Sequence, residues 1–180
     1  PAAGYCGSDA LTYQVCDGPN SCGTASVAIT IKCYPERAIG DMNNVNIIGQ
    51  ADSVNANCQL VGIVHGVNLR ASSGGLQFVL MNNDGSQGIA VFRNTGTFGY
   101  TVQEGDEVVT RGTIAQFSGL TQLNLDTLYK ISGSNPLANP AVVLRMDEST
   151  ESRLVRIKNL HFVDATQWLP GIGSGFTVQV

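Results

Sequence analysis

The sequence is poor in charged residues and in histidine, and both shortages exclude classes of function. Only 13% of the 180 residues are charged, the formal net charge is −4, and the histidines are His65 and His161. Affinity for nucleic acid grows with the number of Lys and Arg side chains that contact phosphates, so this balance disfavours a protein whose main task is to coat nucleic acid. Two histidines and no Cys-x-x-Cys pair provide no ligand set for zinc, and we expect no metal or other cofactor.

Long apolar runs are also missing. No run reaches the roughly 18 residues that cross a bilayer as a helix. No segment combines the basic start and the apolar centre of a signal peptide. We therefore expect no membrane insertion, and we expect any export signal to lie outside this sequence.

What the sequence does contain is typical of β-structure. Glycine is abundant, with 21 residues, and 43% of the residues are hydrophobic. Val, Ile and Thr recur in short runs, and clusters of Gly, Asn, Asp and Ser separate these runs, which is the usual signature of strands joined by turns. We predict an all-β chain with enough apolar residues to build real cores.

Four of the five cysteines fit a single β-hairpin. Cys16 and Cys22 flank a turn-forming cluster between two strand-like runs, so they should face each other. Opposed positions in an antiparallel ladder have a nearly constant sum, which places Cys6 and Cys33 opposite each other one register step away. We predict the disulfides Cys16–Cys22 and Cys6–Cys33, and a Cys33–Cys58 bridge is the alternative. Disulfides form in oxidising compartments, so we expect an exported protein at the cell surface or outside the cell.

Residues 1–33 are expected to form the C-terminal hairpin of an immunoglobulin-like domain. Tyr13 and Val15 share one face of the first strand, and alternating apolar residues from 25 to 31 form a stripe on the second. Two strands alone are marginally stable in water. The remaining strands of such a sandwich must therefore come from elsewhere in the same chain or from another chain.

The stretch 58–140 is predicted to fold as an OB-type barrel. It contains five strand-like runs, with a break after the third, as this fold requires. The first run is interrupted by Gly62 and Gly66, where a strongly coiled barrel strand needs small residues. The five strands are expected at 59–70, 76–81, 88–93, 107–117 and 121–131.

Two further segments flank this barrel. Residues 34–57, which are rich in Asn and Asp, are interpreted as a connector with one short strand at 45–48. Residues 141–180 are interpreted as the start of a second OB-like β-domain, because 154–157 followed by 175–178 echoes the first two strands of the barrel. We expect this second domain and the immunoglobulin-like domain to continue beyond the sequence.

Six segments of the chain carry a resemblance to a known family: residues 62–70, 75–78, 98–108, 112–122 and 148–152, with 7–17 near the start. The first five closely resemble the OB-fold region of very large bacterial proteins that the type IX system exports. The segment 7–17 is similar to the end of one of their immunoglobulin-like or cadherin-like repeats. The resemblance implies a multidomain surface protein, an adhesin or an appendage. Related OB modules also accompany extracellular nucleases, so the resemblance does not select an activity.

The OB fold itself points to a candidate ligand face. Such barrels bind ligands on strands two and three, together with adjacent loops, and aromatic rings beside arginines stack bases or sugars. The alternative is that Phe78, Phe92 and Phe117 only fill the barrel. The candidate ligand residues are Arg70, Gln77, Phe92, Arg93, Gln116, Phe117 and Asn124.

No catalytic constellation is recognisable. His65 lies within an apolar strand and His161 in the second β-unit, and neither is expected to activate a nucleophile. Glu104, Asp106 and Glu107 have the spacing of a tight, solvated turn. We expect a protein that is not an enzyme.

The sequence therefore favours a noncatalytic structural or adhesive segment of a large secreted protein at the cell surface or in an extracellular appendage. The expected partners are neighbouring β-modules of the same large chain, further copies in a homo-oligomer or filament, and a polysaccharide or other cell-surface target. The alternative is an OB-fold module that binds polysaccharide or single-stranded nucleic acid and is accessory to an extracellular nuclease.

Overall fold

The protein is seen here in a computed structural model that describes residues 5–18, 21–167 and 178–179. The chain divides into two compact units, Pro1–Pro35 and Glu36–Val180, and each is described by itself. It is all-β, as predicted: strands dominate, and the described helical elements are one four-residue α-helix and three short 3₁₀-helices. None of its described helices is long and apolar enough to cross a membrane.

The first unit is an antiparallel hairpin of β1 (Gly7–Cys16) and β2 (Cys22–Ile31). Side chains alternate between the two faces of a strand, so the pairs Leu11↔Val27 and Tyr13↔Ala25 lie on one face. Thr12↔Ser26 and Gln14↔Thr24 lie on the opposite face. The hairpin is therefore amphipathic, yet no residue of either strand is buried.

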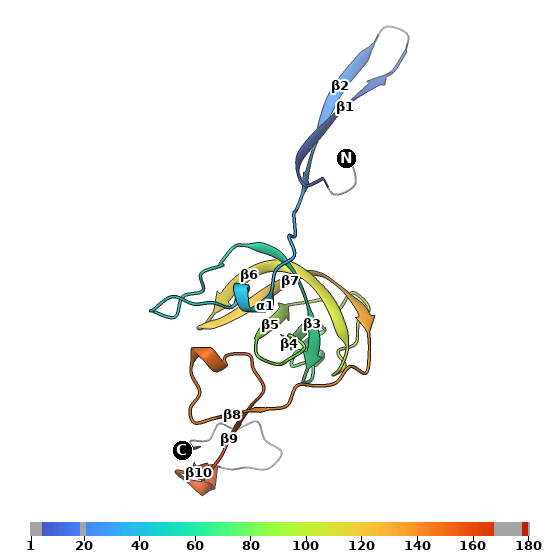
Figure 1. Cartoon of the computed structure of the whole chain (residues 1–180). Coiled ribbons are helices and arrows are strands. Elements are labelled where there is room, and N and C mark those ends of the chain that lie inside the picture. Colours follow the sequence, from blue (N-terminus) through green and yellow to red (C-terminus); the bar gives the residue numbers. More distant parts are fainter. Residues whose placement is uncertain (1–4, 19–20, 168–177, 180) are drawn as a thin grey trace. The chain divides into compact units, whose positions relative to one another are not determined.

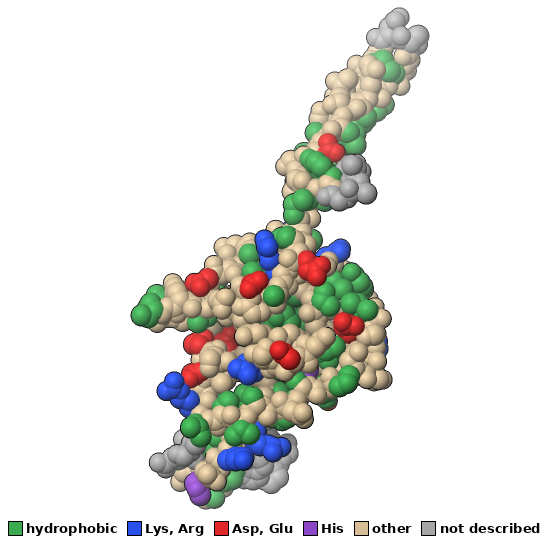
Figure 2. Space-filling view, viewed as in Figure 1, with side chains coloured by type: hydrophobic (Ala, Val, Ile, Leu, Met, Phe, Trp, Pro, Cys, Tyr) green, Lys and Arg blue, Asp and Glu red, His purple; other side chains and the backbone are tan. Residues whose placement is uncertain are grey.

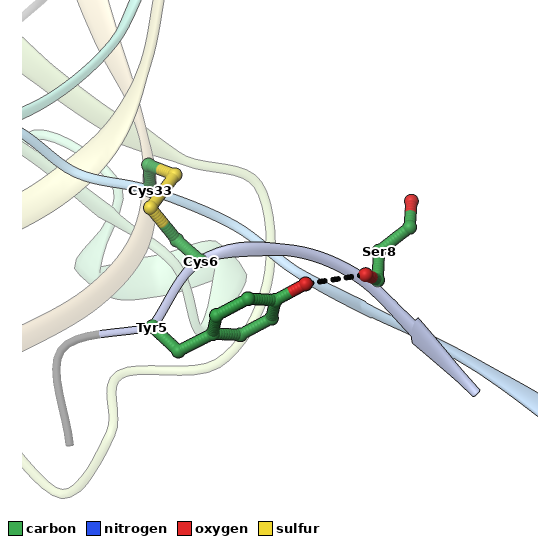
Figure 3. Close-up of a disulfide and its surroundings, with 4 residues drawn as sticks. All are labelled: Tyr5, Cys6, Ser8 and Cys33. Atoms are coloured by element: carbon green, nitrogen blue, oxygen red, sulfur yellow. Dashed lines mark hydrogen bonds between the residues drawn. A yellow bond between two sulfur atoms is a disulfide. The ribbon is translucent and has the colours of Figure 1, made fainter. Parts of the chain in front are cut away.

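Two disulfides close this hairpin at its ends, in the pairs that the ladder register predicts. Cys16–Cys22 closes the last rung beside the turn, with a Cα–Cα distance of 4.0 Å. Cys6–Cys33 lies just outside the first rung, with a Cα–Cα distance of 5.2 Å (Figure 3). Next to it, the phenol of Tyr5 donates a hydrogen bond to the carbonyl of Ser8. Cys58 is the remaining thiol, free and buried in the second unit.

The second unit contains a closed five-stranded barrel (Figure 1). Its order is β3–β4–β5–β7–β6, and every neighbouring pair is antiparallel except β5 with β7. This Greek-key order in a small barrel is the predicted OB architecture. The strands are β3 (Asn57–His65), β4 (Leu76–Met81), β5 (Gly88–Arg93), β6 (Glu107–Phe117) and β7 (Leu120–Ser132).

The barrel interior is filled by apolar side chains. Phe78, Leu60 and Leu123 are among the largest fully buried residues, and they point inward from different strands. Gly62 permits the close approach of strands that this packing requires. A Cβ at Gly62 would lie 2.5 Å from the carbonyl oxygen of Met81, which confirms that the first barrel strand needs a small residue there. Gly66 instead lies just after β3, at a φ of +79°, and ends the strand earlier than predicted.

From Glu36 onward, the segment 34–57 that was interpreted as a connector belongs to the compact unit that contains the barrel. Helix α1 (Ile39–Met42) buries Ile39 and Met42 against the barrel core. The short strand expected at 45–48 is a turn instead, flanked by a single bridge between Val45 and Ala51. The few apolar residues that dock this segment lie among Asn and Asp residues, so the sequence pattern did not mark them as buried.

The segment after the barrel forms two small sheets. Strand β8 (Ala141–Val143) pairs in parallel with β9 (Val155–Ile157), and β10 (His161–Phe162) pairs antiparallel with β11 (Val178–Gln179). The predicted partner of 154–157 was 175–178, most of which lies outside the described residues. Its described residue Val178 pairs with Phe162. The remaining short helices are η1 (Ala71–Ser73), η2 (Glu148–Thr150) and η3 (Ala165–Gln167).

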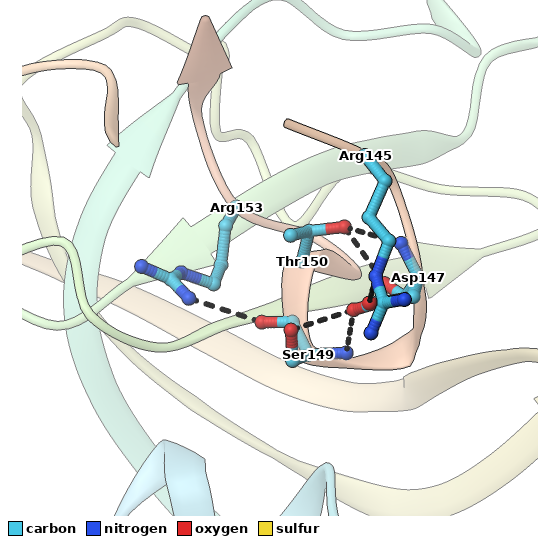
Figure 4. A network of polar contacts seen from close by, with 5 residues as sticks. All are labelled: Arg145, Asp147, Ser149, Thr150 and Arg153. Atoms are coloured by element: carbon cyan, nitrogen blue, oxygen red, sulfur yellow. Dashed lines mark hydrogen bonds and ion pairs between the residues drawn. The ribbon is translucent and has the colours of Figure 1, made fainter. Parts of the chain in front are cut away.

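Helix η2 begins with a complete capping box (Figure 4). The carboxylate of Asp147 accepts hydrogen bonds from the backbone N–H and the hydroxyl of Ser149, and the hydroxyl of Thr150 accepts from the backbone N–H of Asp147. The Ser149 hydroxyl, more than the neighbouring Arg145, lowers the pKa of the Asp147 carboxyl. Arg153 donates from Nη1 to the Ser149 carbonyl at 3.0 Å and completes the network.

Candidate functional site

The candidate site is an open groove of about 310 Å³ on the barrel unit. It lies beside β5 and β7, the two strands that run parallel to each other. The residues that line it are Phe92, Arg93, Asn94, Thr95, Asn124, Leu125 and Asp126. Three of the seven sequence-predicted ligand residues, Phe92, Arg93 and Asn124, are therefore together in this groove.

A row of cross-strand neighbours continues the site over the outer surface of the barrel. Gln77 of β4 pairs with Phe92 of β5, which pairs with Asn124 of β7. All three side chains have the parity opposite to the buried Phe78 and Leu123, so they point outward. Gln77, Phe92 and Asn124 therefore share one outward face.

Arg70 joins this row from the loop between β3 and β4. Its guanidinium carbon lies 5.1 Å from the centroid of the Phe92 ring, and its Nη2 donates to Oδ1 of Asn94 at 2.8 Å. Asn68 holds the loop in position, since its Oδ1 accepts from the backbone N–H groups of Arg70 and Gln77. The guanidinium is therefore stacked on one face of Phe92, and a ligand would meet the ring at its other face or edge.

Arg93 is fixed at the end of the barrel. Its guanidinium carbon lies 4.2 Å from the centroid of the Phe98 ring, and its Nη1 donates to the carbonyl of Leu125 at 2.9 Å. Its Nε is buried without a hydrogen-bond partner among the described residues. Phe98 was not among the predicted site residues, although it lies in the break after the third strand, where OB loops gather.

Two predicted ligand residues do not belong to the groove. Gln116 is occupied by the backbone: its Nε2 donates to the carbonyls of Gly49 and Gly119, and its Oε1 accepts from Ala51 N–H. Phe117 is 71% exposed, farther along β6 beside the tight turn into β7. Of the rings expected to fill the barrel, only Phe78 does so, because Phe92 and Phe117 point outward.

The turn predicted from the spacing of Glu104, Asp106 and Glu107 is present at 104–105 with Glu104 exposed, but Asp106 is not solvated as predicted. Asp106 is buried, where its Oδ1 lies 2.6 Å from Nζ of Lys130 and its Oδ2 accepts from the hydroxyl of Tyr100 at 3.0 Å. Burial, and to a lesser extent the hydrogen bond to Asp106, raises the pKa of the Tyr100 phenol well above its usual range. Glu104 accepts a hydrogen bond from the N–H of Gly66, and Glu107 accepts one from the hydroxyl of Ser132. The three carboxylates therefore have separate structural partners.

His65 is a structural residue in the end of the barrel. Its Nδ1 lies 3.2 Å from the carbonyl of Ile63, and its Nε2 accepts from Ala138 N–H at 3.1 Å, which fixes the neutral tautomer with the proton on Nδ1. His161 lies on β10 and is exposed. Within residues 5–18, 21–167 and 178–179, no group of three His, Cys, Asp or Glu side chains is arranged to hold a metal ion.

The geometry of the groove suits noncovalent recognition. It combines an aromatic ring, a guanidinium, an amide and a carboxylate over a short distance, which are the groups that bind sugars and bases by stacking and hydrogen bonding. Comparison with known proteins finds no family model that matches the chain and no match among curated proteins.

Proposed function

We propose that this chain is a noncatalytic structural segment of a large secreted protein, located at the cell surface or in an extracellular appendage, and that its β1–β2 hairpin joins it to a neighbouring β-module. The observation that carries the proposal is the amphipathic hairpin. Leu11, Tyr13, Val15 and Val27 on its apolar face are each exposed by more than two-fifths.

A hairpin that exposes an apolar face of this kind is not stable in water by itself. A two-stranded hairpin is marginal, and three or more strands or a packed second layer are needed for independent stability. The opposite face is polar, with Thr12, Gln14, Thr24 and Ser26, so burial is required on one side only. These properties match the edge hairpin of a β-sandwich whose second sheet is provided by a neighbouring module.

The two disulfides support an extracellular location. Cys6–Cys33 and Cys16–Cys22 persist in oxidising compartments and stabilise small elements that lack a core of their own. Because the disulfides hold the hairpin in register, its apolar face is a fixed surface for packing. An adhesin or an appendage requires such a surface where its modules meet. The barrel, whose interior is filled by buried side chains, would then serve as a rigid spacer.

Amide hydrogen exchange tests this proposal. The exchange of β1 and β2 is measured in the isolated chain and in the protein recovered from the surface of intact cells, with the amides of β6 as the internal reference. We expect β6 to be equally protected in both samples and the hairpin to be protected only in the recovered protein. Rapid exchange of the hairpin in both samples, or absence of the protein from the surface, would contradict the proposal.

The groove favours a second candidate function, an OB-fold module that binds polysaccharide or single-stranded nucleic acid. Phe92 and Arg93 are the residues that would stack on and hydrogen-bond to such a chain. The test is a titration with labelled oligo-dT and with an uncharged glucan at low salt. Phe92→Ala and Arg93→Ala should each weaken binding, while Phe117→Ala, outside the groove, should not. If the protein binds neither polymer, this candidate function is ruled out.

A further inference from the structure

The outward residues of the candidate groove belong to a longer row that crosses all five strands of the barrel. Asn124 of β7 pairs with Thr113 of β6, and Thr113 pairs with Asn57 of β3. Thr113 and Asn57 each precede a fully buried residue, Ile114 and Cys58 respectively, so both side chains point outward. In the order of the strands β4, β5, β7, β6 and β3, the row consists of Gln77, Phe92, Asn124, Thr113 and Asn57, which we call the outer row.

The outer row presents amides, a hydroxyl and one aromatic ring, and none of its side chains is charged. Two hydrogen bonds orient its polar groups. Nε2 of Gln122 donates to Oδ1 of Asn124 at 2.8 Å, and Oγ1 of Thr113 donates to Oδ1 of Asn57 at 2.8 Å. Both asparagines therefore have a fixed amide orientation, and their Nδ2 groups have no acceptor among the described residues. These N–H groups are available to a ligand.

The charges beside the outer row are balanced. Arg93 and Asp126 both line the groove, so a cation and an anion lie together there. Arg93 donates to a backbone carbonyl, and Arg70 is stacked on Phe92. Figure 2 shows acidic and basic side chains interspersed over the visible face of the barrel unit, where the described residues form no continuous basic stripe. A polyanion binds through a run of cations that neutralise its charges, so this surface does not favour nucleic acid.

The chemistry of this surface matches an uncharged polysaccharide. Sugar hydroxyls both donate and accept hydrogen bonds, and amide and hydroxyl side chains do the same. The C–H face of a pyranose ring is apolar and stacks on an aromatic ring. Phe92 provides that ring, and since Arg70 covers one of its faces, a sugar would stack on the other face or on the edge.

The outer row has room for several sugar units. Neighbouring strands lie about 4.8 Å apart, so the four steps across five strands cover about 19 Å of the barrel surface. Because the barrel is closed, the row curves around it, and a ligand chain contacts the part centred on Phe92 and Asn124, where the groove lies. Affinity should therefore rise with the length of an oligosaccharide until the curvature of the barrel ends the contact.

We propose that the groove and the adjoining part of the outer row bind an uncharged polysaccharide chain and not a polyanion. Phe92 stacks on a sugar ring, and the amides of Asn124 and Gln77 form hydrogen bonds with sugar hydroxyls on either side of it. The assignment of a ligand class rests on the binding function given above as the second candidate. It does not involve the hairpin, so the structural role proposed for β1 and β2 is independent of it.

Isothermal titration calorimetry of the full chain tests the ligand class. The uncharged probes are cellohexaose and mannohexaose, and the anionic probes are oligo-dT and an oligomer of galacturonate. We expect an uncharged hexasaccharide to bind with a dissociation constant that changes by less than about twofold between about 20 mM and about 500 mM salt, because no counterions are released. The matching disaccharide should bind about tenfold more weakly or worse, since it contacts fewer residues of the row.

Substitutions on the outer row test the location. Phe92→Ala should weaken hexasaccharide binding about tenfold, the effect of losing one stacked ring. Asn124→Ala should weaken it by roughly threefold to tenfold through the loss of a hydrogen bond. Both side chains point outward, so the barrel core is unchanged in either variant. Phe117→Ala, at an exposed ring outside the groove, is the matched control and should bind like the wild type.

The outcomes separate a wrong ligand class from a wrong function. Salt-sensitive binding of an anionic probe, with no binding of either uncharged hexasaccharide, would overturn the ligand class and leave the groove as a binding site. If no probe binds, the second candidate function is lost together with the ligand class. Binding of a hexasaccharide that Phe92→Ala and Asn124→Ala both leave unchanged would place the ligand elsewhere and overturn the proposal.

Discussion

The ammonium of Lys130 lies 2.6 Å from the buried carboxylate of Asp106, and this ion pair ties the end of β7 to the turn that begins β6. The carboxylate side chain is 3% exposed and the Lys130 side chain 43%, so the pair is half-buried. Tyr100 donates to the second carboxylate oxygen. A charged group removed from water in this way needs both partners to remain stable.

Asp106→Asn should therefore destabilise the barrel. We expect the free energy of unfolding to fall by about 1–3 kcal/mol, since the substitution removes the charge that compensates Lys130 and weakens the acceptor of Tyr100. Tyr100→Phe should cost about 1 kcal/mol, the usual loss for one hydrogen bond. Urea unfolding measures both. Asp84→Asn, at an exposed carboxyl, is the control, and an Asp106→Asn curve equal to the control would refute a structural role for the pair.

The Cys58 thiol makes the stability of the protein depend on pH in the alkaline range. Burial raises the pKa of this thiol to about 11, against a partial opposing effect of Arg37. The folded pKa lies above the unfolded one, so the stabilisation is complete below about pH 9 and is lost as the pH rises towards 11. The wild type should lose stability over this range relative to Cys58→Ala. A pH-independent difference between the two proteins would contradict the assignment.

Gly112 is a position where a methyl group should not be tolerated. A Cβ there would lie 2.1 Å from the carbonyl oxygen of Asn124, on the adjacent strand, where β6 and β7 shift register. We expect Gly112→Ala to lower the free energy of unfolding by about 1–3 kcal/mol through overpacking. Gly23→Ala has no atom within 4 Å of the new Cβ and serves as the control. Equal thermal stability of the two variants would show that the strands can separate at little cost.

Peptide mapping of the unreduced protein should recover two linked pairs, Cys6 with Cys33 and Cys16 with Cys22, and a Cys58 that reacts with thiol reagents only after unfolding. The buried position of Cys58 protects it in the native state. Recovery of a Cys33–Cys58 linkage would contradict both the Cys6–Cys33 pair and the free thiol of Cys58.

The strands of this protein could be predicted largely from the sequence because local alternation determines them. The bounds expected for the second, third and fourth barrel strands, 76–81, 88–93 and 107–117, are those of β4, β5 and β6. The cysteine pairing followed from the ladder register for the same reason. The outward row of Gln77, Phe92 and Asn124 is likewise a consequence of strand parity.

Features that depend on distant partners could not be predicted in this way. Asp106 has the sequence context of an exposed turn, and the approach of Lys130, from the far end of β7, makes its burial tolerable. Gln116 looked like a ligand residue, but the loop before β3 folds back onto it. Ile39 and Met42 are isolated apolar residues among polar neighbours, and no periodicity marks them as core.

The bridge between Cys6 and Cys33 has a mechanical consequence. It closes a covalent loop over a sequence separation of 27, and the entire β1–β2 ladder lies inside that loop. When the backbone is stretched from either side of the two cysteines, tension passes through the sulfur–sulfur bond and bypasses the rungs. A pulling force applied to the chain would therefore leave the hairpin unloaded, and the hairpin could not be unzipped by it.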